Sequence, residues 1–210
     1  MLSLWLLPPQ PEMDQLQKQI NEISLQSKGK CPPFVPHITI VGAFPCENDQ
    51  ESKILLQELR TKFQGFGSIP CYFVPYPPNE NSNKVKEDKH GQGYVLGEGR
   101  VVCSISKEGS ILWNQSCLSI MHRSKKFMNA VRMAKEVIFS ATEEICDIEF
   151  SPPVMEPHFS FAYGNFDANL CSSIPSPPDL ISTTMSLFWT YPVSLEGVQE
   201  WSEVGRIDLR

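Results

Sequence analysis

The sequence contains one short pattern twice, and this repetition constrains the fold more than any other feature. Residues 36–40 read Pro-His-Ile-Thr-Ile, and residues 157–161 read Pro-His-Phe-Ser-Phe. Each copy therefore has the order proline, histidine, apolar, hydroxyl, apolar. Because side chains alternate between the two faces of a β-strand, the histidine and the hydroxyl of each copy share a face, and the apolar residues point to the other. A proline suits the first position of a strand, where no ladder donor is required.

Two such strands side by side would place two imidazoles, His37 and His158, and two hydroxyls, Thr39 and Ser160, around one cleft. A single His-x-Thr on a strand is most often an ordinary half-buried strand. Here, however, two of the chain's 4 histidines occupy matched positions. Imidazole has an unperturbed pKa of ~6.5, so it serves as acid or base near neutrality. The repeated pattern therefore favours acid–base chemistry that needs no metal.

Composition narrows the class of protein. With 210 residues, 41% of them hydrophobic and 20% charged, the chain is expected to form one domain or two tightly packed lobes. The net charge of −6 disfavours a long nucleic acid partner, so a nucleotide ligand would be small or a terminus. The apolar stretch before Pro8 is too short to span a membrane and lacks the positive region of a signal peptide.

The 7 cysteines are scattered and odd in number, and none has the spacing of a zinc site. Neither a disulfide scaffold nor a metal centre is therefore indicated. Reduced thiols are typical of the cytoplasm or nucleus, so we expect a cytoplasmic location, with the nucleus as the alternative.

Hydrophobic periodicity and turn signals predict the remaining elements. Helices are expected at 11–25, 49–64, 123–146 and 166–172, and strands, besides the two motif strands, at 2–7, 69–76, 93–106, 110–121, 180–191 and 198–208. Residues 77–92, which include His90, are polar and rich in breakers, and predict a flexible surface loop insertion. His122 is interpreted as a residue at a helix boundary. Each half of the chain contains helices, a motif strand and further strands, which predicts an α+β fold in a single domain over 1–210. We expect a bilobal duplicated unit in which antiparallel sheets face a central cleft, the helices lie outside, and a pseudo-twofold axis relates the two lobes.

With both motifs, Trp5 and the segment Val198-Gln-Glu-Trp-Ser-Glu-Val204 in view, the sequence resembles the plant and fungal cyclic phosphodiesterases of the two-histidine phosphoesterase superfamily. The resemblance covers 1–45, 150–165 and 180–208, and does not extend to the middle of the chain. It implies a bilobal α+β fold. It also implies hydrolysis of a ribose cyclic phosphate, namely nucleoside 2′,3′-cyclic phosphate to the 2′-phosphate, or ADP-ribose 1″,2″-cyclic phosphate, a by-product of tRNA splicing.

The chemistry of the motifs agrees with this reaction, because one histidine takes a proton from water while the other gives one to the departing oxygen. Thr39 and Ser160 would donate hydrogen bonds to the non-bridging phosphate oxygens. The family's direction of ring opening makes His37 the acid and His158 the base, although the near-symmetry of the motifs allows the reverse.

The resemblance adds two residues. Tyr163 would contact the phosphate, and Trp5 would stack on the base or ribose; the alternative for Trp5 is a core aromatic. Strict alternation after His158 would send Tyr163 to the core face. It reaches the cleft only if the strand bulges or ends near Gly164.

Other functions stay open at this point. The partner is expected to be a small nucleotide cyclic phosphate, with RNA termini as a further option, and the protein a monomer without cofactor, metal or membrane. The alternatives are a two-histidine enzyme acting on RNA 3′ ends or 2′,5′-oligoadenylate, and an inactive module that binds nucleotides. Intact histidines and hydroxyls in both motifs favour an enzyme over the binding module.

Overall fold

The computed structural model describes residues 1–73, 86–87, 93–96, 101–105, 115–143, 157–164, 166–167, 170, 173–192 and 194–210. Its helices are α1 (Glu12–Gln26), α2 (Asp49–Phe63), α3 (Lys125–Glu143) and the short 3-10 helix η1 (Gly197–Glu200). Its strands are β1 (Leu2–Leu7), β2 (Ile38–Phe44), β3 (Ile69–Cys71), β4 (Lys86–Glu87), β5 (Gly93–Leu96), β6 (Val101–Ile105), β7 (Gln115–Ile120), β8 (His158–Gly164), β9 (Leu180–Ser182), β10 (Thr184–Trp189) and β11 (Ser202–Asp208).

The described strands form one large antiparallel sheet and one small one. The large sheet has nine strands in the order β11-β10-β1-β2-β8-β7-β6-β5-β4, and β3 pairs with β9 in the other. The predicted α+β class is therefore correct. The expected facing sheets are joined into one, because β2 and β8 are paired at a single position, Ile38 opposite Phe159. This pair is the seam between the two halves of the molecule.

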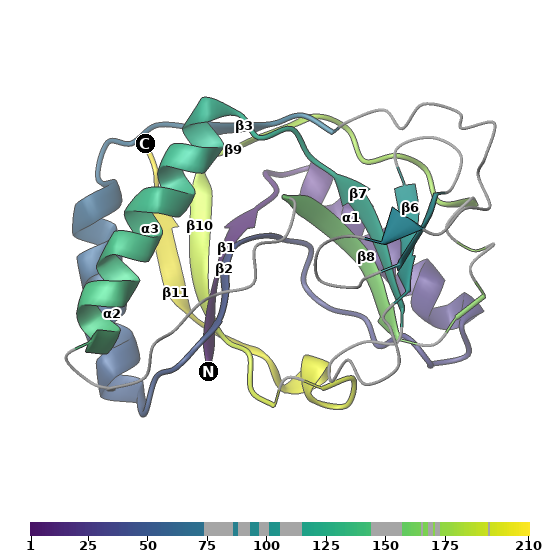
Figure 1. Cartoon of the computed structure of the whole chain (residues 1–210), viewed down its shortest axis with the longest axis horizontal. Helices are drawn as coiled ribbons and strands as arrows, with labels where there is room; N and C mark the ends of the chain where they lie inside the picture. The colour runs from purple at the N-terminus through teal and green to yellow at the C-terminus, as the bar shows by residue number, and fades with distance from the viewer. Residues whose placement is uncertain are drawn as a thin grey trace.

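The helices lie on both halves. Figure 1 shows α2 and α3 together beside β10 and β11, and α1 on the other half with β7 and β8. In agreement, α2 packs against β11, α3 against β2, and α1 against β8. The chain thus leaves the first half after β1, forms α1 on the second half, and returns to the first half as β2.

Local sequence explains where the helices begin and what they bury. Asn48 caps α2, since its side chain accepts the amide hydrogens of Gln50 and Glu51, and the Glu51 carboxylate accepts the amide hydrogen of Glu47. Gly65, with a φ of 68°, follows the helix in the left-handed conformation that glycine favours. The apolar stripe of α1, namely Leu16, Ile20 and Ile23, is buried in the main core.

Three of the predicted strands have wrong boundaries. The segment 93–106 is not one strand but two, β5 and β6, which pair with each other; the two glycines between them in sequence are a turn signal that the prediction passed over. The segment 180–191 divides at Thr183 between two different sheets. The segment 198–208 begins as η1 and becomes a strand only at Ser202.

Other predictions are tested only in part. Of the strand expected at 69–76, Ile69–Cys71 form β3, and Phe73 bridges to Met121. Of the 77–92 loop, only Lys86–Glu87 are described, as β4; the rest of it, with His90, and most of the expected helix at 166–172 lie outside the described residues. Within the described parts, no helix is both long enough and apolar enough to cross a membrane.

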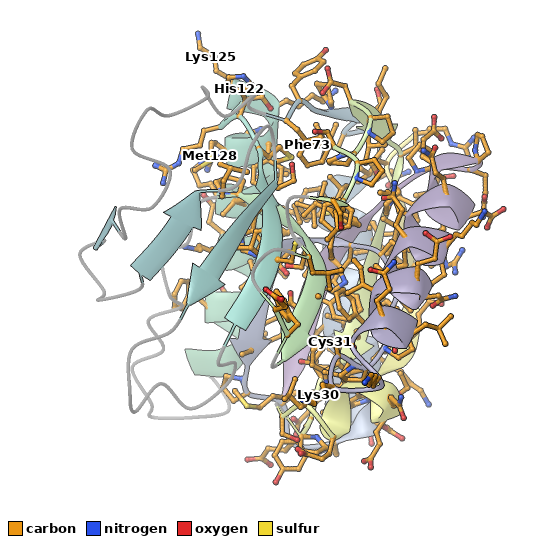
Figure 2. All side chains as sticks on the ribbon, turned by 90° about the vertical axis from the view of Figure 1, so that its right-hand side faces the viewer. Lys30, Cys31, Phe73, His122, Lys125 and Met128 are labelled. Atoms are coloured by element: carbon orange, nitrogen blue, oxygen red, sulfur yellow. The ribbon has the colours of Figure 1, made fainter. Side chains whose placement is uncertain are left out.

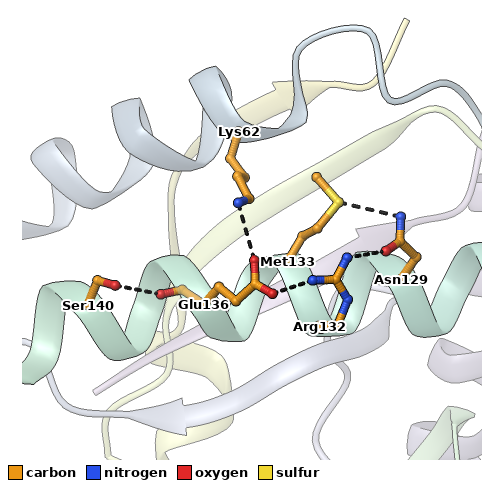
Figure 3. A network of polar contacts seen from close by, with 6 residues as sticks. All are labelled: Lys62, Asn129, Arg132, Met133, Glu136 and Ser140. Atoms are coloured by element: carbon orange, nitrogen blue, oxygen red, sulfur yellow. Dashed lines mark hydrogen bonds and ion pairs between the residues drawn. The ribbon is translucent and has the colours of Figure 1, made fainter.

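A polar network joins α2 to α3 on the surface. Glu136 of α3 pairs with Arg132 one turn earlier and accepts a 3.2 Å hydrogen bond from the Lys62 ammonium of α2 (Figure 3). The Lys62 bond is the main cause that lowers the pKa of this carboxyl. All three side chains are well exposed, so the network contributes little to the stability of the fold.

Candidate active site

The seam between β2 and β8 brings the two motifs together. Ile38 of β2 pairs with Phe159 of β8, and each of these residues lies between the histidine and the hydroxyl of its own motif. Because side chains alternate along a strand, the histidine and the hydroxyl of each motif share the face opposite to Ile38 and Phe159. Both motifs therefore flank the one position at which the two halves of the sheet are paired.

The opposite face of both strands is core. The four apolar residues of the motifs are at most 5% exposed and belong to the main hydrophobic cluster: Ile38, Ile40, Phe159 and Phe161. Burial of these side chains fixes the register, because a slip by one residue would send each of them to the other face. The hydrophobic core thus determines that the histidines and hydroxyls face together.

His37 is held in one protonation state and one orientation. The side chain is 3% exposed, and its Nδ1 lies 2.6 Å from the carbonyl oxygen of Val35. A carbonyl only accepts, so Nδ1 carries the proton and Nε2 carries the lone pair. Burial lowers the pKa of His37 to about 4, with the Val35 bond opposing this effect and His158 adding to it. The imidazole is therefore neutral near pH 7.

Trp5 of β1 packs directly on this imidazole. The two ring centroids are 3.7 Å apart, with an angle of 11° between the planes. Trp5 also stacks on Phe188 of β10, with centroids 4.1 Å apart, and only 2% of the residue is exposed. The stacking on base or ribose expected from the resemblance stays a prediction, and the structure places the ring in a buried aromatic cluster.

A bulge in β8 brings Tyr163 to the motif hydroxyl. Leu118 of β7 pairs with Ser160, but the next residue, Cys117, pairs with Ala162, so Phe161 is an extra residue. The bulge reverses the alternation, and the Tyr163 hydroxyl donates a 2.7 Å hydrogen bond to the oxygen of Ser160. Burial raises the pKa of Tyr163 to about 12, which keeps it a neutral donor.

Two contributors were not singled out by the sequence. The ring of Phe34 is 6% exposed and contacts both His37, edge-on at 5.7 Å, and Tyr163, at 4.9 Å between centroids. The other is the Val35 carbonyl. A backbone acceptor has no signature in sequence, whereas Phe34 could have been noticed from its place three residues before His37.

The ends of β8 are defined by different neighbours. At its start, His158 pairs with Ile120 of β7. His122, which lies two residues after Ile120 and is exposed, donates its amide hydrogen to the Tyr72 carbonyl. At its end, Gly164 meets the loop containing Lys30 and Cys31. Figure 2 shows His122 and Lys125 at the opposite end of the molecule from Lys30 and Cys31. His122 is a boundary residue before α3, as predicted.

A cavity of about 750 Å³ lies elsewhere, along one face of α3. It is lined by Met128, Val131, Arg132, Lys135, Glu136, Phe139 and Ser140, and none of the four motif residues is among them. Its size alone does not assign it chemistry, because its charged side chains are solvated and two of them belong to the network of Figure 3. Across the described ranges, no three His, Cys, Asp or Glu side chains gather as metal ligands would.

Comparison with known proteins agrees with this geometry. Residues 1–70 match the model of a family described as cyclic phosphodiesterase-like protein. The structure of E. coli LigT in apo form superimposes with a TM-score of 0.52, at 13% identity, over 99% of this chain and 95% of that one. The same protein complexed with 3′-AMP gives a TM-score of 0.51, at 12% identity, over 99% and 97%. The chain has the fold of E. coli LigT.

This fold and the family match of residues 1–70 agree with the resemblance drawn from the motifs. At such identities the solved structures establish the architecture and nothing finer. Among curated proteins, no sequence matches this chain significantly. The family match is confined to the first third of the chain, which holds β1, α1 and the first motif strand.

Proposed function

We propose that this protein hydrolyses ribose cyclic phosphates by acid–base catalysis with its two histidines. The substrates would be nucleoside 2′,3′-cyclic phosphates, opened to nucleoside 2′-phosphates, and ADP-ribose 1″,2″-cyclic phosphate, opened to ADP-ribose 1″-phosphate. The observation that supports the proposal is the pairing of Ile38 with Phe159, the residues that lie between the histidine and the hydroxyl of each motif. The cyclic phosphodiesterase-like match of residues 1–70 and the 3′-AMP held by LigT support a nucleotide ligand.

In this proposal His37 is the general base, the reverse of the role expected from the resemblance, and the substrate binds with its 3′ oxygen toward His158. The Nδ1 proton of His37 is committed to the Val35 carbonyl, so the Nε2 lone pair is what the ring offers. With a pKa of about 4, His37 carries no second proton at neutral pH and so has none to give as an acid. The histidine that starts the reaction unprotonated is the one suited to activate water.

His158 completes the reaction as the general acid. Water attacks phosphorus as His37 takes one of its protons, the bond from phosphorus to the 3′ oxygen breaks, and His158 donates a proton to that oxygen. One P–O bond forms and one breaks, and the product is a 2′-phosphate with a free 3′ hydroxyl. Transfer of a proton through water from His37 to His158 restores the starting state. Each such proton transfer is typically worth ~10²–10⁴-fold in rate.

The motif hydroxyls would hold the two non-bridging oxygens. Because Ser160 accepts the hydrogen bond from Tyr163, its own proton is available to donate to the phosphate. Thr39, directly across from Trp5 on β1, is partly exposed on the same face. Donors fixed in place before the reaction stabilise the charge that grows on phosphate oxygens in the transition state. In this arrangement Tyr163 acts through Ser160 and does not itself touch the phosphate.

The test is incubation with adenosine 2′,3′-cyclic phosphate in excess EDTA, with separation of the two AMP isomers. Accumulation of 2′-AMP is expected. His37→Ala and His158→Ala should each lower kcat/KM by at least ~10²-fold while circular dichroism stays unchanged. His122→Ala is the matched control, because it removes an exposed histidine outside the motifs and should leave the rate within twofold of wild type.

The outcomes separate the alternatives. Formation of 3′-AMP would keep the reaction class and contradict the direction of opening. Near-wild-type turnover by either motif mutant would refute the acid–base assignment. If the wild-type protein turns over neither this compound nor ADP-ribose 1″,2″-cyclic phosphate, the proposal fails for cyclic substrates, and RNA 3′ ends and 2′,5′-oligoadenylate are the next candidates.

A further inference from the structure

The indole of Trp5 is enclosed on both faces. In the sheet, β1 lies between β10 and β2, and the two stacking partners of Trp5 come from these two neighbours. Phe188 of β10 stacks at 4.1 Å and His37, just ahead of β2, at 3.7 Å. Partners that approach from opposite sides of β1 occupy opposite faces of the ring. With 2% of the residue exposed, no face is left for a nucleobase to stack on.

The contact with His37 is close and nearly parallel. Aromatic pairs in proteins usually have centroids 4.5–7 Å apart in offset or edge-on arrangements. A separation of 3.7 Å with 11° between the planes is therefore a face-to-face contact at van der Waals distance. Phe188 covers the far face of Trp5, and Trp201 packs beside it at 5.7 Å. The imidazole thus rests directly on the indole, within a buried aromatic cluster.

The stack and the Val35 bond restrict different motions of the same ring. Stacking on Trp5 fixes the plane of the imidazole, and the 2.6 Å bond from Nδ1 to the Val35 carbonyl fixes its rotation within that plane. Together they leave the Nε2 lone pair of His37 pointing in one direction. Among the described residues, the ionisable group that acts electrostatically on His37 is His158, across the seam on β8.

We infer that Trp5 is a positioning residue, which holds the His37 imidazole in its reactive orientation and does not stack on the substrate. The effect that we expect on kcat rests on the proposed function. The effect that we expect on the titration of His37 rests on the geometry alone. A group held to within a fraction of an ångström is what acid–base catalysis needs, because a displacement of ~1 Å can cost ~10²-fold in rate.

The experiment compares Trp5→Leu, Trp5→Phe and Phe188→Leu with the wild-type protein. Trp5→Leu removes the ring beneath His37, Trp5→Phe keeps a smaller one, and Phe188→Leu removes a buried ring of the same cluster that stacks on the far face of Trp5. Phe188→Leu is the matched control for loss of packing. Where Trp5→Leu does not fold, the comparison of Trp5→Phe with Phe188→Leu carries the test.

Positioning predicts a split between kcat and KM on adenosine 2′,3′-cyclic phosphate. Trp5→Leu should lower kcat by ~10–100-fold with KM within about twofold, and Trp5→Phe should recover much of the loss. Phe188→Leu should change kcat less than ~3-fold. A rise of KM of tenfold or more with kcat unchanged would establish substrate stacking and overturn the inference. An equal loss of kcat in Phe188→Leu would assign the effect to packing, and would overturn it too.

A second readout does not depend on any substrate. In nuclear magnetic resonance titrations of the histidine side chains, the His37 midpoint should move up by about one unit or more in Trp5→Leu, because the ring becomes solvated. It should stay in place in Phe188→Leu. An unmoved midpoint in Trp5→Leu would overturn the inference even if the enzyme is active. A moved midpoint in a protein that turns over no cyclic phosphate would instead leave the positioning intact and refute the proposed function.

Discussion

The hydroxyl of Tyr163 donates a 2.7 Å hydrogen bond to the oxygen of Ser160, three residues earlier on the same strand. On a regular strand these side chains would point to opposite faces, and the bulge at Phe161 brings them to one. The bond connects a tyrosine outside the repeated motif to a hydroxyl inside it. It gives the serine a fixed orientation that its short side chain could not maintain alone.

Tyr163→Phe should therefore weaken catalysis without abolishing it. Loss of one neutral hydrogen bond is worth about 0.5–1.5 kcal/mol, so we expect kcat to fall ~2–10-fold while the protein stays folded. The measurement is steady-state kinetics on adenosine 2′,3′-cyclic phosphate. Tyr191→Phe is the matched control, because Tyr191 is 67% exposed, and its rate should equal that of wild type. A loss above ~10³-fold in Tyr163→Phe would mean that this hydroxyl contacts the phosphate directly.

The pH profile should reflect the unusual state of His37. With a pKa of about 4 and a role as base, His37 is deprotonated at pH 5, where an ordinary histidine is largely protonated. The acid limb of kcat/KM should therefore be flat down to pH 5 and fall about tenfold per unit only below pH 4. A half-loss of kcat/KM near pH 6.5 would contradict the assignment of His37 as base.

The same shift links stability to pH. Between about pH 6.5 and 4 the unfolded chain binds a proton at His37 and the folded protein does not, so the free energy of unfolding falls as the pH falls. The full contribution is about 3 kcal/mol, present above pH 6.5 and lost by pH 4. Urea unfolding at several pH values should show this slope in wild type and a flatter one in His37→Gln. Equal slopes in wild type and His37→Gln would exclude His37 as the source.

Gly164 should tolerate no side chain. Its φ is 145°, and an added Cβ would lie 2.3 Å from the carbonyl oxygen of Lys30. Gly164→Ala is expected to destabilise the protein by roughly 3 kcal/mol or more, since neither backbone can yield cheaply. Gly29→Ala also places a side chain at positive φ, 78°, but meets nothing within 4 Å, and should cost only about 1–2 kcal/mol. Equal costs in urea unfolding would show that the Lys30 contact relaxes.

The sequence predicted the part of this site that depends on local alternation. The matched motifs placed His37 and Thr39 on one face and Ile38 and Ile40 on the other, and the buried fractions of these isoleucines agree. The three long helices were located to within three residues at each end, because their apolar stripes and end signals are local too.

What escaped prediction depends on partners far away in the chain. The stack of Trp5 between His37 and Phe188 exists because β1 lies between β10 and β2, an order that no local pattern states. The bulge that redirects Tyr163 is a property of the pairing with β7. The bond that orients His37 ends on a backbone carbonyl, which every residue has, and so could not be recognised from residue types.

The seam at Ile38 and Phe159 has one more consequence. The two histidines belong to different halves of the sheet, and a single pair of residues joins the strands that carry them. Because both histidines come directly before the residues of this pair, a small rotation of one half about it would displace them far less than it would displace the outer strands of the sheet. The two proton-transferring groups thus lie next to the pivot, where their separation is least affected by a change in the angle between the halves.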